Sequence, residues 1–286
     1  EVVDAAEVVA MNESPTAPLR SKRDSSMSVA LRLVRDGVAG AFVTAGNTGA
    51  AMVAAKVTLG MVEGVERPAL AATAPGMDHS TLIVDVGANV DCKPTHLCQF
   101  GVMGHFYSKA VMGTANPRVG LLSVGEEEGK GDRVTQEAYR LLADAGLNFI
   151  GNVEGRDVYA GTVDVVVCDG FVGNVVLKVS EGLGEMVFKL LKREANRSPV
   201  SAAGFLLAKG ALTGFRRQVD YAEYGGAPLL GVRGACLIGH GRSNAKAVRN
   251  ALRVAHSYAV RGVIESIERR VASLLPAATE PEPVRA

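Results

Sequence analysis

Tryptophan is absent from the 286 residues, and aromatic side chains make up only 5% of the chain. Proteins that bind single-stranded nucleic acid use aromatic rings as stacking platforms for the bases, so this class is disfavoured. The formal net charge of +1 points the same way, because nucleic-acid binders usually carry a strong basic excess. We therefore expect no nucleic-acid partner.

Cysteine is also scarce, and the four cysteines form no C-x-x-C pair. Three of them lie in or beside apolar runs, where a cysteine is usually a small buried thiol. Cys92, His96 and Cys98 stand close together in the sequence, but their spacing matches no standard zinc pattern and a fourth ligand is not evident. We expect no metal site, and a reducing compartment such as the cytoplasm fits this usage.

No run approaches the ~20 apolar residues that a membrane-spanning helix needs, and no cleavable signal opens the sequence. The chain begins with Glu1 instead of Met, in the middle of a regular alternation of strands and helices. We expect that an N-terminal segment of the natural protein precedes it.

Strand-like runs alternate with helical runs along the chain, and several are continuously apolar. This pattern is typical of strands buried on both faces, and it predicts an α/β fold with a mostly parallel sheet covered by helices. We expect one α/β domain over residues 1–275, a basic amphipathic helical insertion at about 188–220, and a disordered tail at 276–286. The predicted strands are residues 7–11, 40–44, 69–74, 81–86, 119–123, 148–153, 163–168 and 234–238.

Polar, glycine-rich loops follow these strands. Ligands of such sheets bind outside the carboxyl ends of the strands, so we expect the loops to share one site. The turns at 45–49 and 239–244 each open a helix, and the second helix is expected to run from Ala245 to about Val271. A helix N-terminus is a generic seat for phosphate or carboxylate. The loops are residues 45–49, 87–94, 124–132, 169–174 and 239–244.

The usual catalytic fingerprints are missing. The sequence contains no G-x-S-x-G elbow, no G-x-x-x-x-G-K-[ST] loop and no G-x-G-x-x-G motif. We therefore expect no covalent nucleophile and no cofactor. A reaction in which inorganic phosphate itself attacks a thioester needs only groups that hold the phosphate, a donor for the developing oxyanion, and exclusion of water.

The loops supply candidates for each of these roles. Each candidate could equally be an ordinary helix cap, a solvated helix residue or a turn residue. The catalytic candidates are Lys130, Asp169, Lys178 and His240, and the phosphate-binding candidates are Asn47, Thr48, Gly49, Asn174 and Ser243.

The basic segment near 188–219 contains large apolar side chains as well as lysines and arginines. Such a segment can lie on an anionic membrane surface, and it can equally be a helix at a dimer interface or against the core. The candidates for membrane contact are Phe205, Leu206, Leu212 and Phe215.

At its motifs the sequence resembles the bacterial phosphate acyltransferase family PlsX, from about Glu7 to about Ile264. The motifs are KRDSSM (22–27), AGNTGA (45–50), DVGANVDCKP (85–94), GKG (129–131), DGFVGN (169–174) and GHGRS (239–243). Members of that family begin with a strand and an Asp-Ala-Met-Gly-Gly-Asp loop that this sequence lacks.

The resemblance implies transfer of a fatty acyl group from acyl-acyl carrier protein to inorganic phosphate, which gives acyl-phosphate for phospholipid biosynthesis. It also implies a fold related to isopropylmalate dehydrogenases and phosphotransacetylases, a homodimer, and a peripheral association with the inner membrane surface or a membrane acyltransferase. Two alternatives stay open. One is an NAD(P)-linked decarboxylating dehydrogenase of the related fold, for which Glu126–Glu128 is the only tempting acidic run. The other is an inactive scaffold that binds acyl carrier protein.

Overall fold

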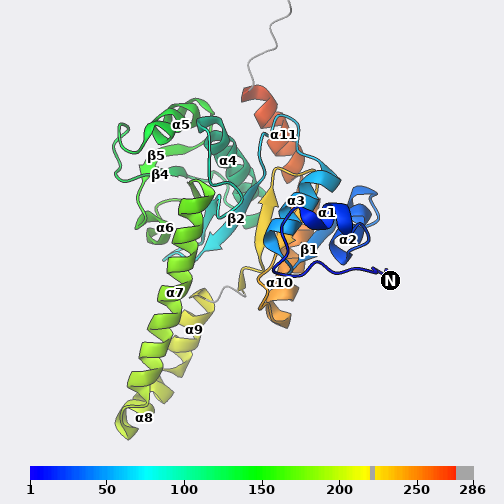
Figure 1. Ribbon diagram of the computed structural model, residues 1–286. Coiled ribbons are helices and arrows are strands. Elements are labelled where there is room, and N and C mark those ends of the chain that lie inside the picture. Colours follow the sequence, from blue (N-terminus) through cyan, green and yellow to red (C-terminus); the bar gives the residue numbers. More distant parts are fainter. Residues whose placement is uncertain (220–222, 275–286) are drawn as a thin grey trace, which may run out of the picture.

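A single mixed sheet of eight strands forms the centre of the computed structural model, which describes residues 1–219 and 223–274 (Figure 1). The strands are β1 (Ala41–Thr44), β2 (Ala69–Ala74), β3 (Thr81–Val84), β4 (Val119–Leu122), β5 (Phe149–Val153), β6 (Val165–Val167), β7 (Ala227–Leu230) and β8 (Ala235–Ile238). Their order across the sheet is β1-β8-β7-β2-β3-β6-β4-β5.

The strands run in two directions. The pairs β1–β8, β3–β6, β6–β4 and β4–β5 are parallel. In the middle of the sheet, β8–β7, β7–β2 and β2–β3 are antiparallel. The parallel group β3, β6, β4 and β5 therefore points opposite to the parallel pair of β1 and β8.

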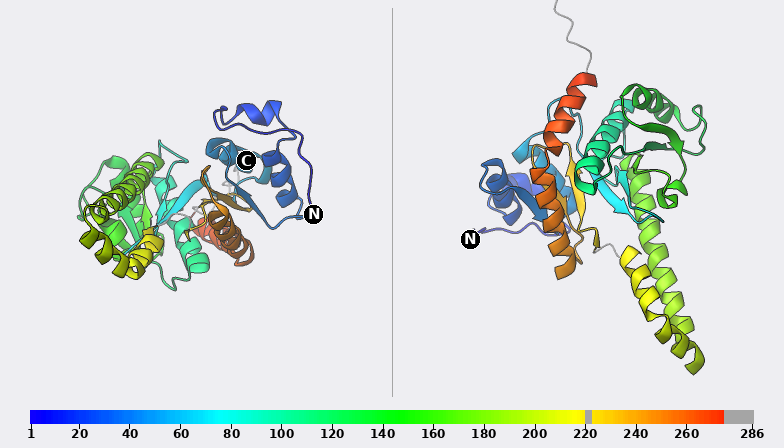
Figure 2. Two further views of the ribbon diagram at one scale, coloured as in Figure 1. Left: turned by 90° about the horizontal axis from the view of Figure 1, so that it is seen from below. Right: turned by 180° about the vertical axis from the view of Figure 1, so that it is seen from behind.

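Helices cover both faces of the sheet (Figure 2). Neighbouring residues of one strand pack in different apolar clusters on the two faces of the sheet. In β3, Leu82 and Val84 belong to the first cluster and Ile83 belongs to the second. The first cluster includes side chains of α4 (Pro94–Tyr107), α5 (Arg133–Asp144), α10 (Ala245–Val260) and α11 (Val263–Leu274). The second includes α2 (Ser26–Arg35), α3 (Thr48–Leu59) and α6 (Asp157–Ala160). Burial on both faces explains the continuous apolar runs of the strands.

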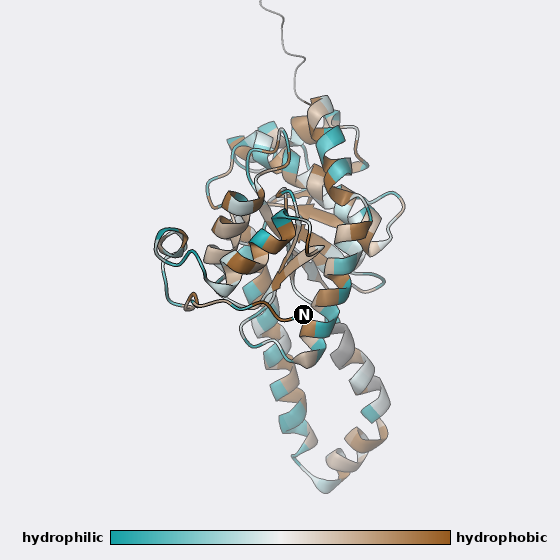
Figure 3. Ribbon diagram, turned by 90° about the vertical axis from the view of Figure 1, so that its right-hand side faces the viewer, coloured by the Kyte–Doolittle hydropathy of each residue, from teal (hydrophilic) through white to brown (hydrophobic). Residues whose placement is uncertain are grey.

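A helical hairpin projects from this body (Figures 1 and 3). It consists of α7 (Gly170–Ala195), α8 (Pro199–Leu207) and α9 (Lys209–Val219). Along α7 and α9, Phe188 and Phe215 face each other with ring centroids 5.7 Å apart. Most of residues 188–219 lie in these three helices, and the projecting part already begins within α7. No helix in the described part of the chain is long and apolar enough to cross a bilayer.

Three local predictions were wrong. Residues 7–11 form no regular strand and contribute only an isolated bridge from Glu7 to Ser25. Strand β7 was not predicted, because its first residues Ala227 and Pro228 are weak strand formers. The helix expected from 245 to about 271 is two helices, because the chain turns at Gly262 with a positive φ of 65°.

Residues 276–286, the predicted tail, lie outside the described residues. The remaining helices are α1 (Ala17–Ser21) and the π-helical turn η1 (Ser108–Met112).

Candidate functional site

The two strand directions divide the predicted loops between opposite edges of the sheet. We call the edge where β1 and β8 end the β1/β8 edge; it holds loops 45–49 and 239–244. The opposite edge, where β3, β6 and β4 end, is the β3/β4 edge and holds loops 85–93, 124–132 and 169–174. In Figure 1, α10 and α7 accordingly start at opposite ends of the body. Contrary to the expectation from the sequence, the carboxyl ends of the strands therefore do not bring all these loops to one edge of the sheet.

At the β1/β8 edge, Asn47 caps the start of α3. Its side-chain oxygen accepts a hydrogen bond from the Ala50 N–H, at 3.0 Å. Its amide nitrogen lies 2.9 to 3.3 Å from the carbonyl oxygens of Ala10, Met11 and Glu13, to which it donates. The Asn47 side chain is thus committed to holding the N-terminal segment, and the anion-binding capacity of this turn lies in its backbone N–H groups.

Thr48 and Gly49 are the first two residues of α3. A Cβ at Gly49 would lie only 2.8 Å from the Pro15 side chain, so glycine is needed where the N-terminal segment crosses the helix start. The N–H groups of a first helical turn have no partner within the helix, and they carry the positive end of its dipole.

The α10 helix follows β8, the neighbour of β1, and packs on the other face of the sheet from α3. Asn244 caps it by accepting from the Ala247 N–H at 3.0 Å. The preceding loop is tied to the end of β1, since the Gly239 N–H donates to the Thr44 carbonyl at 2.6 Å. Ser243 lies over this contact, because a Cβ at Gly239 would be 3.2 Å from its Oγ. Two helix starts, each capped by an uncharged amide, therefore follow two neighbouring strands at this edge.

His240 stands exposed in the same loop, and its ring is oriented by the backbone. The Arg242 N–H lies 3.1 Å from its Nδ1 and donates to it. In the neutral ring this bond fixes Nδ1 as the acceptor, so the proton is on Nε2. Nε2–H is a suitable donor for an oxyanion or a sulfur atom.

At the β3/β4 edge, the dominant group is a buried carboxylate, Asp85. It accepts hydrogen bonds from the N–H groups of Leu70, Gly87, Ala88 and Asn89 at 2.7 to 3.1 Å, and one from the Asn89 side chain at 2.9 Å. Burial raises the pKa of Asp85, and these donors oppose that rise. Asp85 shapes its loop from within and does not face solvent.

The start of α7 packs on this loop. The Gly170 N–H donates to the Asn89 carbonyl at 2.7 Å, and a Cβ at Gly173 would clash with the Asp85 carbonyl oxygen. Asp169 caps α7 by accepting from Phe171 and Val172 N–H, both at 2.9 Å. The negative charge that a helix start attracts is here supplied by the chain itself. Asn174 lies exposed in the first turn, near Gly87.

Neither of the two candidate lysines belongs to the β1/β8 loops. Lys130 is exposed in loop 124–132, and its backbone N–H donates to the Glu127 carbonyl. That loop leads into α5, which Asp132 caps through the Thr135 N–H at 2.8 Å. Lys178 is on the third turn of α7, where its Nζ forms an ion pair with Glu181 at 2.8 Å. Lys130 and Asp169 therefore share one edge, and His240, Ser243 and the Asn47 turn share the other.

The cysteines do not present a nucleophile. Burial, followed by the charges of Asp85 and Asp169, raises the pKa of the Cys92 thiol to about 12. Burial likewise raises the pKa of Cys98 to about 11 and that of Cys236 to about 12. These thiols stay protonated near neutral pH and are poor nucleophiles. No group of three or more His, Cys, Asp or Glu within residues 1–219 and 223–274 is arranged to hold a metal ion.

Two features of the β1/β8 side were missed from the sequence. Asn244 is a polar residue before a helix, and cap preference alone would have identified it. The other is a cluster at the starts of β4 and β6, where Asp164 accepts from Arg118 Nε at 2.9 Å and contacts His79 Nε2 at 2.8 Å. Along the sequence, Arg118 is 39 residues from His79 and 46 residues from Asp164, which is beyond the range of any local pattern.

The sequence matches the family described as "Fatty acid synthesis protein" over residues 1–266. It is 54% identical over 273 residues to the phosphate acyltransferase of Pelotomaculum thermopropionicum, covering 96% of this chain and 80% of the relative. It is 52% identical to the phosphate acyltransferase of Trichlorobacter lovleyi, covering 93% of this chain and 77% of the relative.

Among solved structures, the fold is similar to two phosphotransacetylases at 16% sequence identity. EutD phosphotransacetylase from Staphylococcus aureus superposes with a TM-score of 0.58, over 83% of this chain and 68% of that one. A phosphotransacetylase from Streptococcus pyogenes gives a TM-score of 0.59, over 84% and 69%. This likeness confirms the expected α/β fold and its relation to phosphotransacetylases.

Proposed function

Because the chain belongs to the phosphate acyltransferase family, we propose that it transfers a fatty acyl group from acyl-acyl carrier protein to inorganic phosphate, for phospholipid biosynthesis. The observation that carries the proposal is the pair of helix starts at the β1/β8 edge, α3 and α10, both capped by neutral asparagines. Two positive dipole ends that follow neighbouring strands, without a carboxylate cap, are suited to bind a dianion.

The backbone N–H groups of Thr48 and Gly49, with those at the start of α10, hold the phosphate at this seat. Ser243 Oγ is a further donor, and Arg242 adds a positive charge at the rim. The side chain of Asn47 acts indirectly by fixing the turn. Such positioning supplies most of what this reaction needs, because phosphate is already nucleophilic near neutral pH.

The reaction needs no group on the protein to become acylated. A phosphate oxygen attacks the thioester carbonyl carbon and forms the new C–O bond, while the carbonyl oxygen becomes an oxyanion to which His240 Nε2–H donates. The oxyanion collapses, the C–S bond breaks, and the sulfur leaves with the bonding electrons. A thiolate whose conjugate acid has a pKa of about 8.5 leaves without prior protonation.

The direct test is phosphate-dependent release of carrier-protein thiol from acyl-acyl carrier protein. We expect His240→Ala to lower kcat by about 100-fold, the usual size of a lost oxyanion donor. His256→Ala is the matched control, because His256 is exposed on α10 away from its start. Thiol release that did not depend on phosphate would instead identify a thioesterase, and equal effects of the two substitutions would remove His240 from the mechanism.

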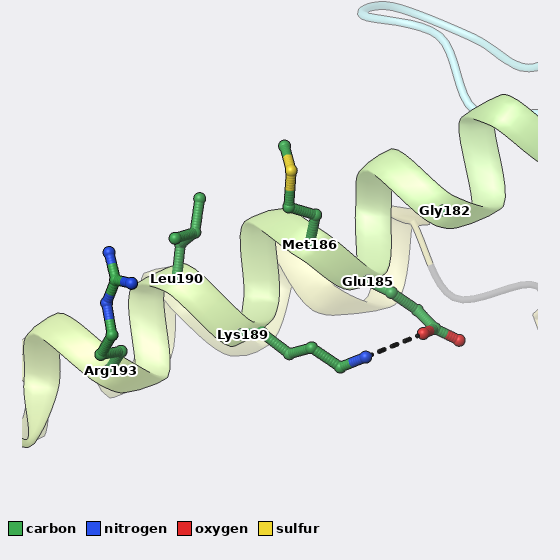
Figure 4. Close-up of a pocket in the computed structure, with 6 residues that line it drawn as sticks. All are labelled: Gly182, Glu185, Met186, Lys189, Leu190 and Arg193. Carbon is green, nitrogen blue, oxygen red and sulfur yellow. Dashed lines mark hydrogen bonds and ion pairs between the residues drawn. The ribbon is translucent and has the colours of Figure 1, made fainter.

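We also propose that two chains pair through α7. A stripe of exposed apolar residues follows this helix at intervals of three or four residues: Val172, Val175, Val179, Leu183, Met186 and Leu190. Met186 and Leu190 point to the same side of the helix, away from the Lys189–Glu185 ion pair, and line a groove of about 370 Å³ (Figure 4). A continuous apolar stripe of this length favours a protein partner, and a second α7 is complementary to it.

Light scattering tests the pairing. We expect Leu183→Lys with Met186→Lys to convert a dimer to a monomer, and Lys192→Ala, at an exposed position of α7 that does not line the groove, to leave it dimeric. A mass that is unchanged by the double substitution would place the interface elsewhere.

The end of the hairpin supports a peripheral membrane contact at the inner surface. The α8 helix has no charged residue, and it exposes Val200, Leu206 and Leu207 by 82%, 70% and 89%. Arg197 and Lys209 flank it and suit an anionic surface. Of the other predicted contacts, Phe205 and Leu212 are half-buried, and Phe215 is 43% exposed while contacting Phe188.

Co-sedimentation with phosphatidylglycerol vesicles tests this contact. We expect Leu206→Asp with Leu207→Asp to abolish binding. The control is Val248→Asp, at an exposed position of α10, and it should bind as the natural chain does. Binding by both variants would exclude the α8 contact.

A further inference from the structure

A second cationic site lies far from the β1/β8 edge, between the C-terminal end of α4 and α11. This groove has a volume of about 430 Å³, and its polar lining includes His105, Lys109, Ser266, Arg269, Arg270 and Ser273. The α10 helix separates it from the proposed phosphate seat, because α10 starts at the seat and its 16 residues span about 24 Å before α11 begins.

The groove is positively charged without compensation from its own walls. Lys109 comes from η1, and Arg269 and Arg270 come from α11. No carboxylate lines the groove, and within the described ranges none lies within ion-pair distance of these three side chains. Several other basic residues of the fold behave differently, as Arg118, Arg133, Arg156 and Lys178 each form an ion pair.

The cations are also held in place. Arg270 donates to the Gly146 carbonyl at 2.8 Å, which fixes the guanidinium beside the loop after α5. Arg269 lies 3.4 Å from the Ser266 Oγ. Each contact uses one nitrogen of a group with five N–H donors, so most donors of both arginines are available to a ligand.

His105 provides an independent sign of a ligand. Its side chain is only 8% exposed, yet its Nδ1 is buried with no hydrogen-bond partner. Buried polar atoms are nearly always satisfied, and one that is not satisfied points to a cause such as a bound group. Burial, followed by the charges of Lys109 and Arg270, lowers the pKa of His105, whereas a hydrogen bond to the backbone of Pro117 favours the charged form.

We infer that this groove binds the phosphate group of a small molecule, at a site separate from the reactive edge. Forked guanidinium groups and an ammonium group match the tetrahedral array of phosphate oxygens. The His105 ring lines the same groove, so an anion held by these cations changes the electrostatic environment of the ring.

The test uses the full chain with ¹⁵N-labelled histidine and follows the ring nitrogens by NMR. His105 reports on the groove and His240 on the β1/β8 edge, so failure of this inference is distinguishable from failure of the proposed function. The probes are inorganic phosphate and butyl phosphate, added separately. We expect a saturable shift of His105 with at least one probe, and the probe that causes it identifies free phosphate or a phosphomonoester as the ligand class.

The variant Lys109→Gln with Arg269→Gln spares Arg270, which supports Gly146, and should fold normally. We expect it to weaken the binding seen at His105 by about tenfold or more, as expected for the loss of two charge-assisted contacts. The control, Arg140→Gln with Lys192→Gln, removes the same charge from exposed positions outside the groove and should bind as the natural chain does.

Three results would overturn the inference. One is no shift of His105 with either probe, and another is equal weakening in variant and control. For the third, acyl carrier protein without its phosphate-bearing arm is added as a further probe. If it alone shifts the His105 signal, the groove is a protein-docking surface instead.

Discussion

The two edges of the sheet carry similar glycine-rich loops but begin their helices differently. At the β1/β8 edge, α3 and α10 are capped by Asn47 and Asn244, whose amides are neutral. At the β3/β4 edge, α7 and α5 are capped by the carboxylates of Asp169 and Asp132, whereas α4 begins after Lys93 without a carboxylate cap. A carboxylate cap occupies the seat that an anionic ligand would take, whereas an amide cap leaves the positive dipole end open. From the caps of α3, α10, α5 and α7 we propose that the first edge binds phosphate and that the second supports the fold.

The largest effect is expected at the supporting edge. Asp85→Ala leaves five donors around Asp85 without their acceptor, in a site closed to water. We expect the free energy of unfolding to fall by about 3 to 5 kcal/mol, measured by urea denaturation. If stability were unchanged while activity was lost, Asp85 would belong to the reacting site and the contrast between the edges would fail.

The next prediction tests how far the phosphate-binding part of the β1/β8 edge extends. Arg118→Gln removes the main ion-pair partner of Asp164. Asp164 lies on the same side of the molecule as the β1/β8 edge, but at the starts of β4 and β6. We expect a loss of about 2 kcal/mol in unfolding free energy, with the KM for phosphate unchanged. A rise in that KM would extend the binding site beyond the α3 and α10 starts.

The same variant has a defined pH dependence. Burial alone would raise the pKa of Asp164, but the hydrogen bonds and charge of Arg118 outweigh it and hold that pKa below its ordinary value of 3.8. The stabilisation is therefore complete above the ordinary value and is lost as the pH falls through the lowered one. We expect the stability difference between the natural chain and Arg118→Gln to shrink in acid below about pH 3.8, as urea denaturation across a pH series would show.

A single oxygen-for-nitrogen exchange makes the binding edge resemble the supporting one. Asn244→Asp keeps the cap of α10, because aspartate accepts the same N–H, but places a negative charge at the phosphate seat. We expect the KM for phosphate to rise by about tenfold or more, with no loss of thermal stability. Unchanged steady-state kinetics would mean that phosphate does not approach the start of α10.

The smallest effects on the KM for phosphate are expected from substitutions of charged residues at the supporting edge. Asp169→Asn retains a cap for α7, and Lys130→Ala removes an exposed cation from loop 124–132. We expect both to leave the KM for phosphate within about twofold of the natural value. A large effect of Lys130→Ala would restore the sequence-based hypothesis that this lysine grips phosphate.

The sequence predicts the strands of the parallel groups well, because continuous apolar runs such as 81–86 and 163–168 are typical of strands that are buried on both faces. It does not predict their directions. Whether β3 runs parallel or antiparallel to β8 depends on β7 and β2 between them, and β7 is only four residues with a proline. Loops that look equivalent along the chain therefore leave the sheet at two different edges, which the sequence does not predict.

The caps were within reach of sequence reasoning. Asn47, Asn244, Asp132 and Asp169 all precede helical runs, and the charge of these side chains alone distinguishes the two edges. The roles of Asp85 and of the His79–Asp164–Arg118 cluster were not within reach, because both depend on contacts between distant segments.

The division between a binding edge and a supporting edge is tested most directly by a crystal structure of the chain with phosphate bound. We expect phosphate at the β1/β8 edge, within hydrogen-bond distance of the Thr48 and Gly49 N–H groups and of Ser243, with His240 beside it. Phosphate bound instead at the start of α7 next to Lys130, with the starts of α3 and α10 empty at saturating phosphate, would contradict this division.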